Sequence, residues 1–198
     1  MIVSVRINTD KTNIDSVDEI INIFDVEGIR DKVNINLARV IAPTDACLEI
    51  EPTCLDVAEF AAKEVVFMKE LKARGFTKHQ QMSYPTIRLN HCCADNLSSF
   101  VIDYNGNMYK CYNDIGLAEC AVGNICESFD AMDVLGKSSK YILNLPTKME
   151  ECKKCNLLPI CMGGCPYNLS KGESCCSGVK YELDNILREK YKELVSNI

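Results

Sequence analysis

The stretch Cys152-Lys-Lys-Cys155-Asn-Leu-Leu-Pro-Ile-Cys161-Met-Gly-Gly-Cys165-Pro166 decides the character of this chain. Its four thiols have the spacing C-x2-C-x5-C-x3-C, and we call it the cysteine run. A C-x2-C pair can direct two sulfurs to one ion, and Gly163 and Gly164 allow the backbone to turn tightly around a bulky centre. Cysteines that only fill a hydrophobic core are not expected to lie so close together in the sequence. The pattern therefore indicates an iron–sulfur centre or a four-cysteine zinc site, because zinc sites also use C-x2-C pairs.

Composition sets the broad class of the protein. The chain has 198 residues, 47% of them hydrophobic and 25% charged, as in a globular protein of one domain or two small ones. The net charge of -6 argues against a nucleic-acid partner and an anionic membrane surface. No apolar run reaches membrane-spanning length and no leader is visible, so we expect a cytoplasmic protein with no membrane partner. In a reducing compartment, thirteen cysteines indicate metal binding rather than disulfides.

The N-terminal part alternates between strand and helix patterns. Strand-forming residues occupy 2–7 and, in alternation, 33–37. The capping-box pattern Ser16-Val-Asp-Glu19 precedes a helix that is predicted to end at Gly28. A longer helix is predicted over 55–74. The order strand, helix, strand, helix indicates a parallel α/β arrangement.

Beyond Tyr84-Pro85 the pattern changes to short strands between cysteines. A strand is predicted over 85–90. A β-hairpin is predicted from 99–103 and 108–112, because Asn105-Gly106 between two β-forming runs is a strong hairpin signal. This hairpin would return Cys111 toward the segment that begins at His91.

The remaining sequence features are two helical patterns and two histidines. One helix is predicted around 129–135, and apolar residues from Val179 to Leu194 recur on one face of a closing helix. His79 is expected to be a solvated loop residue. His91 either hydrogen-bonds a cluster sulfur or simply ends a strand.

Together the cysteines have the order and spacing of the seven-cysteine SPASM pattern. It begins at Cys92 or Cys93, continues through Gly106-x4-Cys111 and the cysteine run, and closes at Cys175 or Cys176. The chain therefore resembles the C-terminal part of certain radical S-adenosylmethionine (radical SAM) enzymes. That family includes peptide maturases and anaerobic sulfatase maturases.

The resemblance implies a fold of two domains. Residues 1–83 would be the C-terminal remnant of a partial (β/α)6 barrel, with 6–13 as the best-matching segment. Residues 84–198 would be a cysteine-rich α+β SPASM domain with a β-hairpin and short helices. The overall fold class would be α/β.

The resemblance also implies two auxiliary 4Fe-4S clusters. The last cysteine of the run would cross to the other cluster, as in bacterial ferredoxins. The inner cluster would take Cys92, Cys111 and Cys165. The outer cluster would take Cys152, Cys155, Cys161 and Cys176. Family offsets favour Cys92 over Cys93 and Cys176 over Cys175, and Cys93 is the candidate fourth inner ligand unless that iron is open. Cys120 and Cys126 are expected to be plain loop thiols.

Two departures from the family pattern limit the expected activity. The C-x3-C-x2-C motif that binds S-adenosylmethionine is absent from the sequence, as are the first barrel strands. We therefore expect a part of a larger enzyme: a truncated product, an expressed fragment or a split protein. This chain alone would be inactive, S-adenosylmethionine would bind only to the full-length enzyme, and an N-terminal radical SAM half would be a partner.

The second departure concerns the substrate. Sulfatase maturases place an aspartate directly after the hairpin cysteine, where this chain has Tyr112. The tyrosine at this position favours modification of a peptide or protein substrate other than a sulfatase. Asp114 lies close by and is expected to be a solvated turn residue. The alternative function is a stand-alone iron–sulfur or zinc binding module without catalytic activity.

Overall fold

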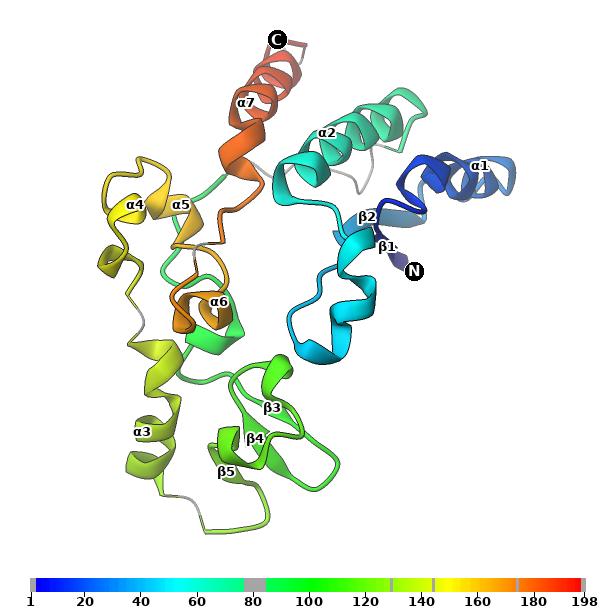
Figure 1. Ribbon diagram of the computed structural model, residues 1–198. Coiled ribbons are helices and arrows are strands. Elements are labelled where there is room, and N and C mark those ends of the chain that lie inside the picture. The colour runs from blue at the N-terminus through cyan, green and yellow to red at the C-terminus, as the bar shows by residue number, and fades with distance from the viewer. Residues whose placement is uncertain (1–2, 77–84, 129, 144, 174, 197–198) are drawn as a thin grey trace. The chain divides into compact units, whose positions relative to one another are not determined.

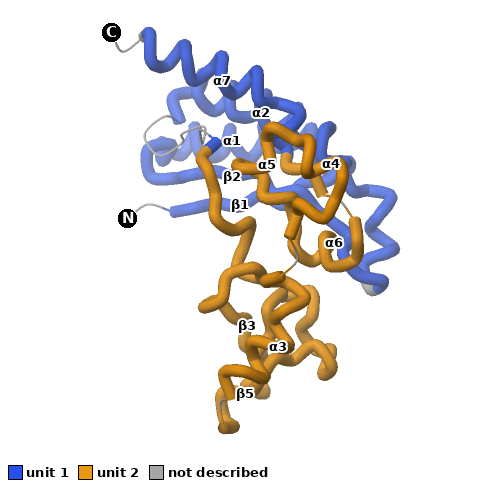
Figure 2. Tube along the Cα trace, turned by 90° about the vertical axis from the view of Figure 1, so that its left-hand side faces the viewer, with its two compact units in different colours: residues 1–85, 178–198 blue, residues 86–177 orange. Residues whose placement is uncertain are grey.

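The computed structural model describes residues 3–76, 85–128, 130–143, 145–173 and 175–196. The chain forms two compact units, one of residues 1–85 and 178–198 and one of residues 86–177 (Figure 2). Among the described residues, 51% are helical and 12% are in strands, and the sheets are small, which agrees with the expected α/β class. The barrel and SPASM assignments stay predictions. The expected boundary between residues 83 and 84, and His79, lie outside the described residues.

A short parallel sheet forms the centre of the first unit (Figure 1). Strand β1 (Val3–Thr9) pairs with β2 (Val33–Arg39) in parallel, with Ile7 opposite Leu37. One face of this sheet is apolar and buried, and its side chains pack with those of the first two α-helices. Both strands and their parallel pairing were predicted.

Helix α1 (Val17–Val26) lies on the apolar face through Val17 and Ile21. It begins and ends where expected, but the predicted capping box is wrong: Ser16 is the N-cap residue and makes no side-chain capping hydrogen bond. A 3-10 turn over Ile14–Ser16 leads directly into the helix and sets its first turn instead. Gly28 has φ of 63° and ends the helix, as predicted.

Helices α2 (Val57–Ala73) and α7 (Val179–Ser196) pack against each other in the first unit. The α2 side chains Phe67 and Leu71 join the core on the sheet. Lys72 Nζ lies 3.4 Å from a carboxylate oxygen of Glu193, so an ion pair links the two helices. Both helices were predicted from their apolar periodicity.

The second unit contains the predicted hairpin in shortened form. Strands β3 (Val101–Ile102) and β4 (Asn107–Tyr109) are antiparallel, and β5 (Gly123–Asn124) pairs with the other edge of β4. The Asp103 carboxylate accepts hydrogen bonds from two backbone N–H groups of the turn, both at 2.9 Å. Gly106 has φ of 82°, a conformation that the Asn-Gly signal predicts.

Residues 85–90 form no strand, so that prediction was wrong. The backbone N–H of Arg88 donates to the Pro159 carbonyl oxygen at 3.0 Å, which fixes the segment along the cysteine run. Ile87 and Leu89 are 80% and 94% exposed. A run of β-forming residues becomes a strand only where a neighbouring strand pairs with it, and the described chain provides none here.

The rest of the second unit is helical. Helix α3 (Ala131–Ile142) packs through Val134 on Met108 and Val122 of the hairpin region. Three one-turn helices follow along the cysteine run: α4 (Glu150–Lys153), α5 (Leu158–Cys161) and α6 (Pro166–Ser170). In the described part of the chain, no helix has the length and apolar character needed to cross a membrane.

Candidate metal centre

A left-handed turn shapes the end of the cysteine run. Met162, Gly163 and Gly164 have φ of 52°, 81° and 84° in succession. A Cβ atom at Gly163 would overlap Pro146 Cβ, and one at Gly164 would overlap the Cys175 carbonyl oxygen. Both glycines are therefore required by conformation and by close approach of the chain. The backbone of Cys175 fills the space beside Gly164.

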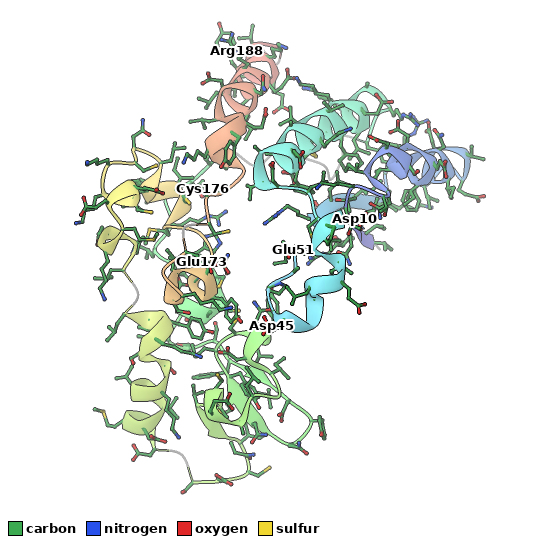
Figure 3. All side chains as sticks on the ribbon, viewed as in Figure 1. Asp10, Asp45, Glu51, Glu173, Cys176 and Arg188 are labelled. Atoms are coloured by element: carbon green, nitrogen blue, oxygen red, sulfur yellow. The ribbon has the colours of Figure 1, made fainter. Side chains whose placement is uncertain are left out.

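The first cysteine group surrounds Cys152. Burial raises the pKa of the Cys152 thiol, and the charges of three other cysteines raise it further, so these sulfurs are its neighbours. The Cys152 group consists of Cys152, Cys155, Cys161 and Cys176. Cys176 comes from the segment that follows α6 (Figure 3). These are the four cysteines expected for the outer cluster.

The second cysteine group surrounds Cys165. Burial raises the pKa of Cys92 to about 11, and Cys165 is among the charges that raise it. Burial also raises the pKa of Cys111, again with Cys165 as a contributing charge. We call Cys92, Cys111 and Cys165 the Cys165 group. The last cysteine of the run thus lies near cysteines from outside the run, and the assignment of these three to an inner cluster stays a prediction.

The remaining candidate cysteines differ in their surroundings. Cys93 is exposed and its charge acts on Cys92. Cys126 is exposed, in agreement with a loop thiol. Cys120 is partly buried, and Lys140 Nζ donates to its sulfur at 3.4 Å. Cys175 approaches Gly164 through its backbone, whereas Cys176 is the neighbour of Cys152.

The loop that carries Cys92 is fixed by Asp95 and His91. The two Asp95 carboxylate oxygens accept hydrogen bonds from the backbone N–H of His91 at 2.8 Å and of Cys92 at 3.0 Å. The Cys92 sulfur accepts from the Ala94 N–H at 3.3 Å, so cysteine takes the place of serine in a capping box. The Cys92-x-x-Asp95 spacing could have revealed this cap, had cysteine been admitted as a capping residue.

His91 does not end a strand, which was one of its two expected roles, and its hydrogen bond to a cluster sulfur stays a prediction. Its Nδ1 lies 3.0 Å from the Cys161 carbonyl oxygen, and the carbonyl can only accept, so Nδ1–H donates. No strand precedes it, since residues 85–90 are irregular. This hydrogen bond joins the loop of Cys92 to the cysteine run.

Asp114 is buried, which corrects the expectation of a solvated turn residue. It is 2% exposed, and its carboxylate accepts a hydrogen bond from the Tyr141 hydroxyl at 2.7 Å. Lys140 Nζ lies 3.1 Å from the same oxygen. Burial and this carboxylate raise the pKa of Tyr141. The network connects the turn after Cys111 to α3, and sequence periodicity carries no signal for it.

The donor chemistry of both groups is that of thiol sulfur. Thiolates are the ligands of iron–sulfur clusters and of structural zinc, so the residues fit either. Within the described ranges, no three histidine, cysteine, aspartate or glutamate side chains have the spacing of an assembled metal site. The members of each group are close enough for the charge of one thiolate to shift the pKa of another.

Solved structures similar to this chain include those of anSMEcpe, an anaerobic sulfatase-maturating radical SAM enzyme. The structure with bound AdoMet and the Cp18Cys peptide has a TM-score of 0.60 and 15% identity, over 96% of this chain and 58% of that one. The histidine-tagged enzyme with bound AdoMet has a TM-score of 0.59 and 17% identity, over 98% and 55%. The native enzyme with bound AdoMet has a TM-score of 0.57 and 16% identity, over 93% and 56%.

The fold is similar to that of anSMEcpe. At these identities the likeness concerns the fold alone, and the chain spans little more than half the length of anSMEcpe. No model of a protein family matches the sequence, and no curated protein matches it.

Proposed function

We propose that this chain is the auxiliary-cluster portion of a radical SAM enzyme that modifies a peptide or protein substrate. The observation that carries the proposal is the similarity to anSMEcpe over 93–98% of this chain, which includes both the strand–helix unit and the cysteine-rich unit. A stand-alone iron–sulfur or zinc module is not favoured, because such a module has no need of the first unit.

The proposed ligands follow the two cysteine groups. The Cys152 group would hold an outer 4Fe-4S cluster. The Cys165 group would hold an inner 4Fe-4S cluster, with Cys93 as its fourth ligand or with one iron left open. The grouping of Cys165 with Cys92 and Cys111, and of Cys176 with Cys152, supports this assignment. The order of thiols along the chain agrees with the SPASM pattern.

The protein's own contribution is to hold these thiols and to limit their contact with water. When bound, the clusters would supply electron transfer, or an open iron to anchor substrate. Asp95 holds the backbone at Cys92, and the His91 hydrogen bond ties that loop to the cysteine run. Cys111 is 6% exposed, and Asp114 and Tyr141 fix the turn that follows it.

The substrate is proposed to be a peptide or protein. The structures of anSMEcpe with bound Cp18Cys or Kp18Cys peptide support this class of partner. The AdoMet in those structures supports S-adenosylmethionine as the cofactor of a full-length enzyme with an N-terminal radical SAM half. Tyr112 in place of the aspartate of sulfatase maturases directs the proposal toward a substrate other than a sulfatase.

Reconstitution without oxygen tests the proposed function. We expect the purified chain to take up about eight irons and an equal amount of sulfide, as two 4Fe-4S clusters. Cys152→Ser should lower the iron content, whereas Cys126→Ser, at an exposed thiol outside both groups, should leave it unchanged. Iron and acid-labile sulfide assays with Mössbauer spectra give the answer. Bound zinc without sulfide would contradict the proposal.

A further inference from the structure

Lys110 carries an ammonium group in the interior of the second unit. The residue is 1% exposed. Its Nζ donates to the carbonyl oxygens of Asn96 at 2.5 Å and Ser99 at 2.6 Å, and lies 4.5 Å from the centre of the Phe100 ring. Carbonyl dipoles and an aromatic ring compensate a buried charge only in part. A cation in this position therefore requires negative charge nearby.

The negative charge near Lys110 comes from the loop that carries the first candidate ligand. Lys110 directly precedes Cys111 in the chain, and its Nζ donates to carbonyl oxygens of the segment 96–99, which follows Cys92, Cys93 and Asp95. The Asp95 carboxylate already accepts two backbone hydrogen bonds within its own loop. The two cysteines are neutral as thiols and become negative only as thiolates, the form in which they bind metal.

We propose that Lys110 is the fixed counter-cation of the inner cluster and raises its reduction potential. The inference rests on the proposed function, because it requires a cluster on the Cys165 group. A thiolate-bound cluster gains one negative charge when it accepts an electron. A buried cation beside it therefore stabilises the reduced state more than the oxidised state, and the low dielectric of the interior strengthens the effect.

The Cys152 group has a different electrostatic environment. The Glu151 charge is among those that raise the pKa of Cys152, after burial and the neighbouring thiols. Lys153, the adjacent cation, has a side chain that is 46% exposed and pairs with Glu150. Solvent screens exposed charges of this kind. Removal of the Lys110 charge should therefore act on one cluster and leave the other almost unchanged.

The test is a redox titration of the reconstituted full chain, with dithionite as reductant and EPR detection of each cluster. Lys110→Met removes the charge and both hydrogen bonds. Lys110→Gln removes the charge but keeps an amide that can donate to the same carbonyls. Lys110→Arg keeps the charge. Lys137→Gln is the matched control, because it removes an exposed lysine charge from the same unit.

We expect Lys110→Gln and Lys110→Met to lower the midpoint potential of the inner cluster. The ratio of reduced to oxidised cluster should fall at least tenfold at a fixed potential, about 59 mV for one electron. Lys110→Arg and Lys137→Gln should keep the wild-type value. If Lys110→Met does not fold, the midpoint potential of the inner cluster in Lys110→Gln is the test of the proposal.

Two results would overturn the inference. The first is an unshifted inner midpoint in Lys110→Gln at full iron content. The second is a shift of the same size in Lys137→Gln. Failure of the proposed function is recognised separately, since the wild-type chain would then contain zinc or lack sulfide.

Discussion

At the scale of single residues, Gly164 controls how the segment after α6 meets the cysteine run. Its left-handed φ and the contact with Cys175 leave no room for a side chain. Because Cys176 directly follows Cys175, this close approach also brings Cys176, the proposed last ligand of the outer cluster, to the run. One glycine therefore links the backbone turn to the composition of the proposed metal centre.

Gly164→Ala should damage both stability and metal binding. The left-handed conformation costs about 1–2 kcal/mol for alanine, and displacement of the Cys175 backbone adds to that cost. Gly172→Ala is the matched control: its φ is 80° and an added Cβ would meet nothing within 4 Å. The free energy of unfolding, measured in urea, and the iron content should both fall further in Gly164→Ala than in Gly172→Ala. Equal losses in the two variants would mean that the contact with Cys175 is unimportant.

Serine at two cysteines of the run tests the crossing of ligands. We expect Cys165→Ser to impair the inner cluster and Cys155→Ser the outer one, because the two residues belong to different groups. Either variant should also loosen the fold, since metal binding contributes to folding free energy. Mössbauer and EPR spectra identify the cluster that is lost. Loss of the same cluster in both variants would refute the crossed assignment.

The ligand assignment of the thiols stays a prediction, and the contacts that hold the surrounding loops were not predicted from the sequence. Spacing separates the cysteine run from the other thiols, and the structure groups Cys165 with Cys92 and Cys111. The Asp95 cap has a spacing signal only if cysteine is admitted as a capping residue, and the contacts of Asp114 have no sequence signal. Asp114 was predicted to be solvated because polar turn residues usually are. It is buried because Tyr141, from a helix 27 residues further along the chain, covers it and donates a hydrogen bond to it.

At the scale of elements, helices α2 and α1 differ in the side-chain capping of their N-termini. The Asp56 carboxylate accepts from the Glu59 N–H at 2.7 Å, and the Glu59 carboxylate accepts from the Asp56 N–H at 3.0 Å. This reciprocal capping box satisfies two N–H groups that the helix leaves without partners. Ser16, at the same position of α1, makes no such hydrogen bond with its side chain.

Alanine at these two caps should therefore have unequal effects. Asp56→Ala should lower the free energy of unfolding by about 1 kcal/mol, the typical loss for an N-cap. Ser16→Ala should change it by only a few tenths of that amount, because no side-chain capping bond is lost. Urea unfolding followed by circular dichroism measures both. A loss at Ser16 as large as that at Asp56 would show that the α1 cap forms in solution.

Elements were predicted well where the periodic signal was long. The seven-residue strands and the helices α1 and α2 have apolar patterns that match their buried faces. Helix α7 forms where its periodicity predicted it, but Tyr191 and Leu194 of its predicted apolar face are exposed. The hairpin was found from Asn-Gly, but β5 has two residues and carries no pattern. The segment 85–90 has a strand-like composition without a pairing strand, so local preference alone gave the wrong answer there.

At the scale of the whole molecule, we expect that this chain alone does not cleave S-adenosylmethionine. Cleavage requires an iron site that chelates the amino and carboxylate groups of the cofactor, and the motif for that site is absent from the sequence. Strands β1 and β2 could supply part of a binding wall, too little to fix the reacting geometry.

Incubation of reconstituted protein with dithionite and the cofactor, followed by detection of 5′-deoxyadenosine, checks this expectation. The product should not exceed a protein-free control. Recovery of turnover on addition of an N-terminal fragment with the C-x3-C-x2-C motif would support the split-enzyme interpretation. Turnover by the chain alone would show that the missing motif is not needed.

The pairing of α2 with α7 has a consequence for synthesis on the ribosome. Residues 57–73 leave the exit tunnel early, whereas residues 179–196 follow the entire cysteine-rich segment. The face of α2 that receives α7 must therefore stay uncovered until every thiol of residues 86–177 has emerged. Any delay in translation of that segment lengthens the time during which chaperones or proteases can recognise the uncovered helix.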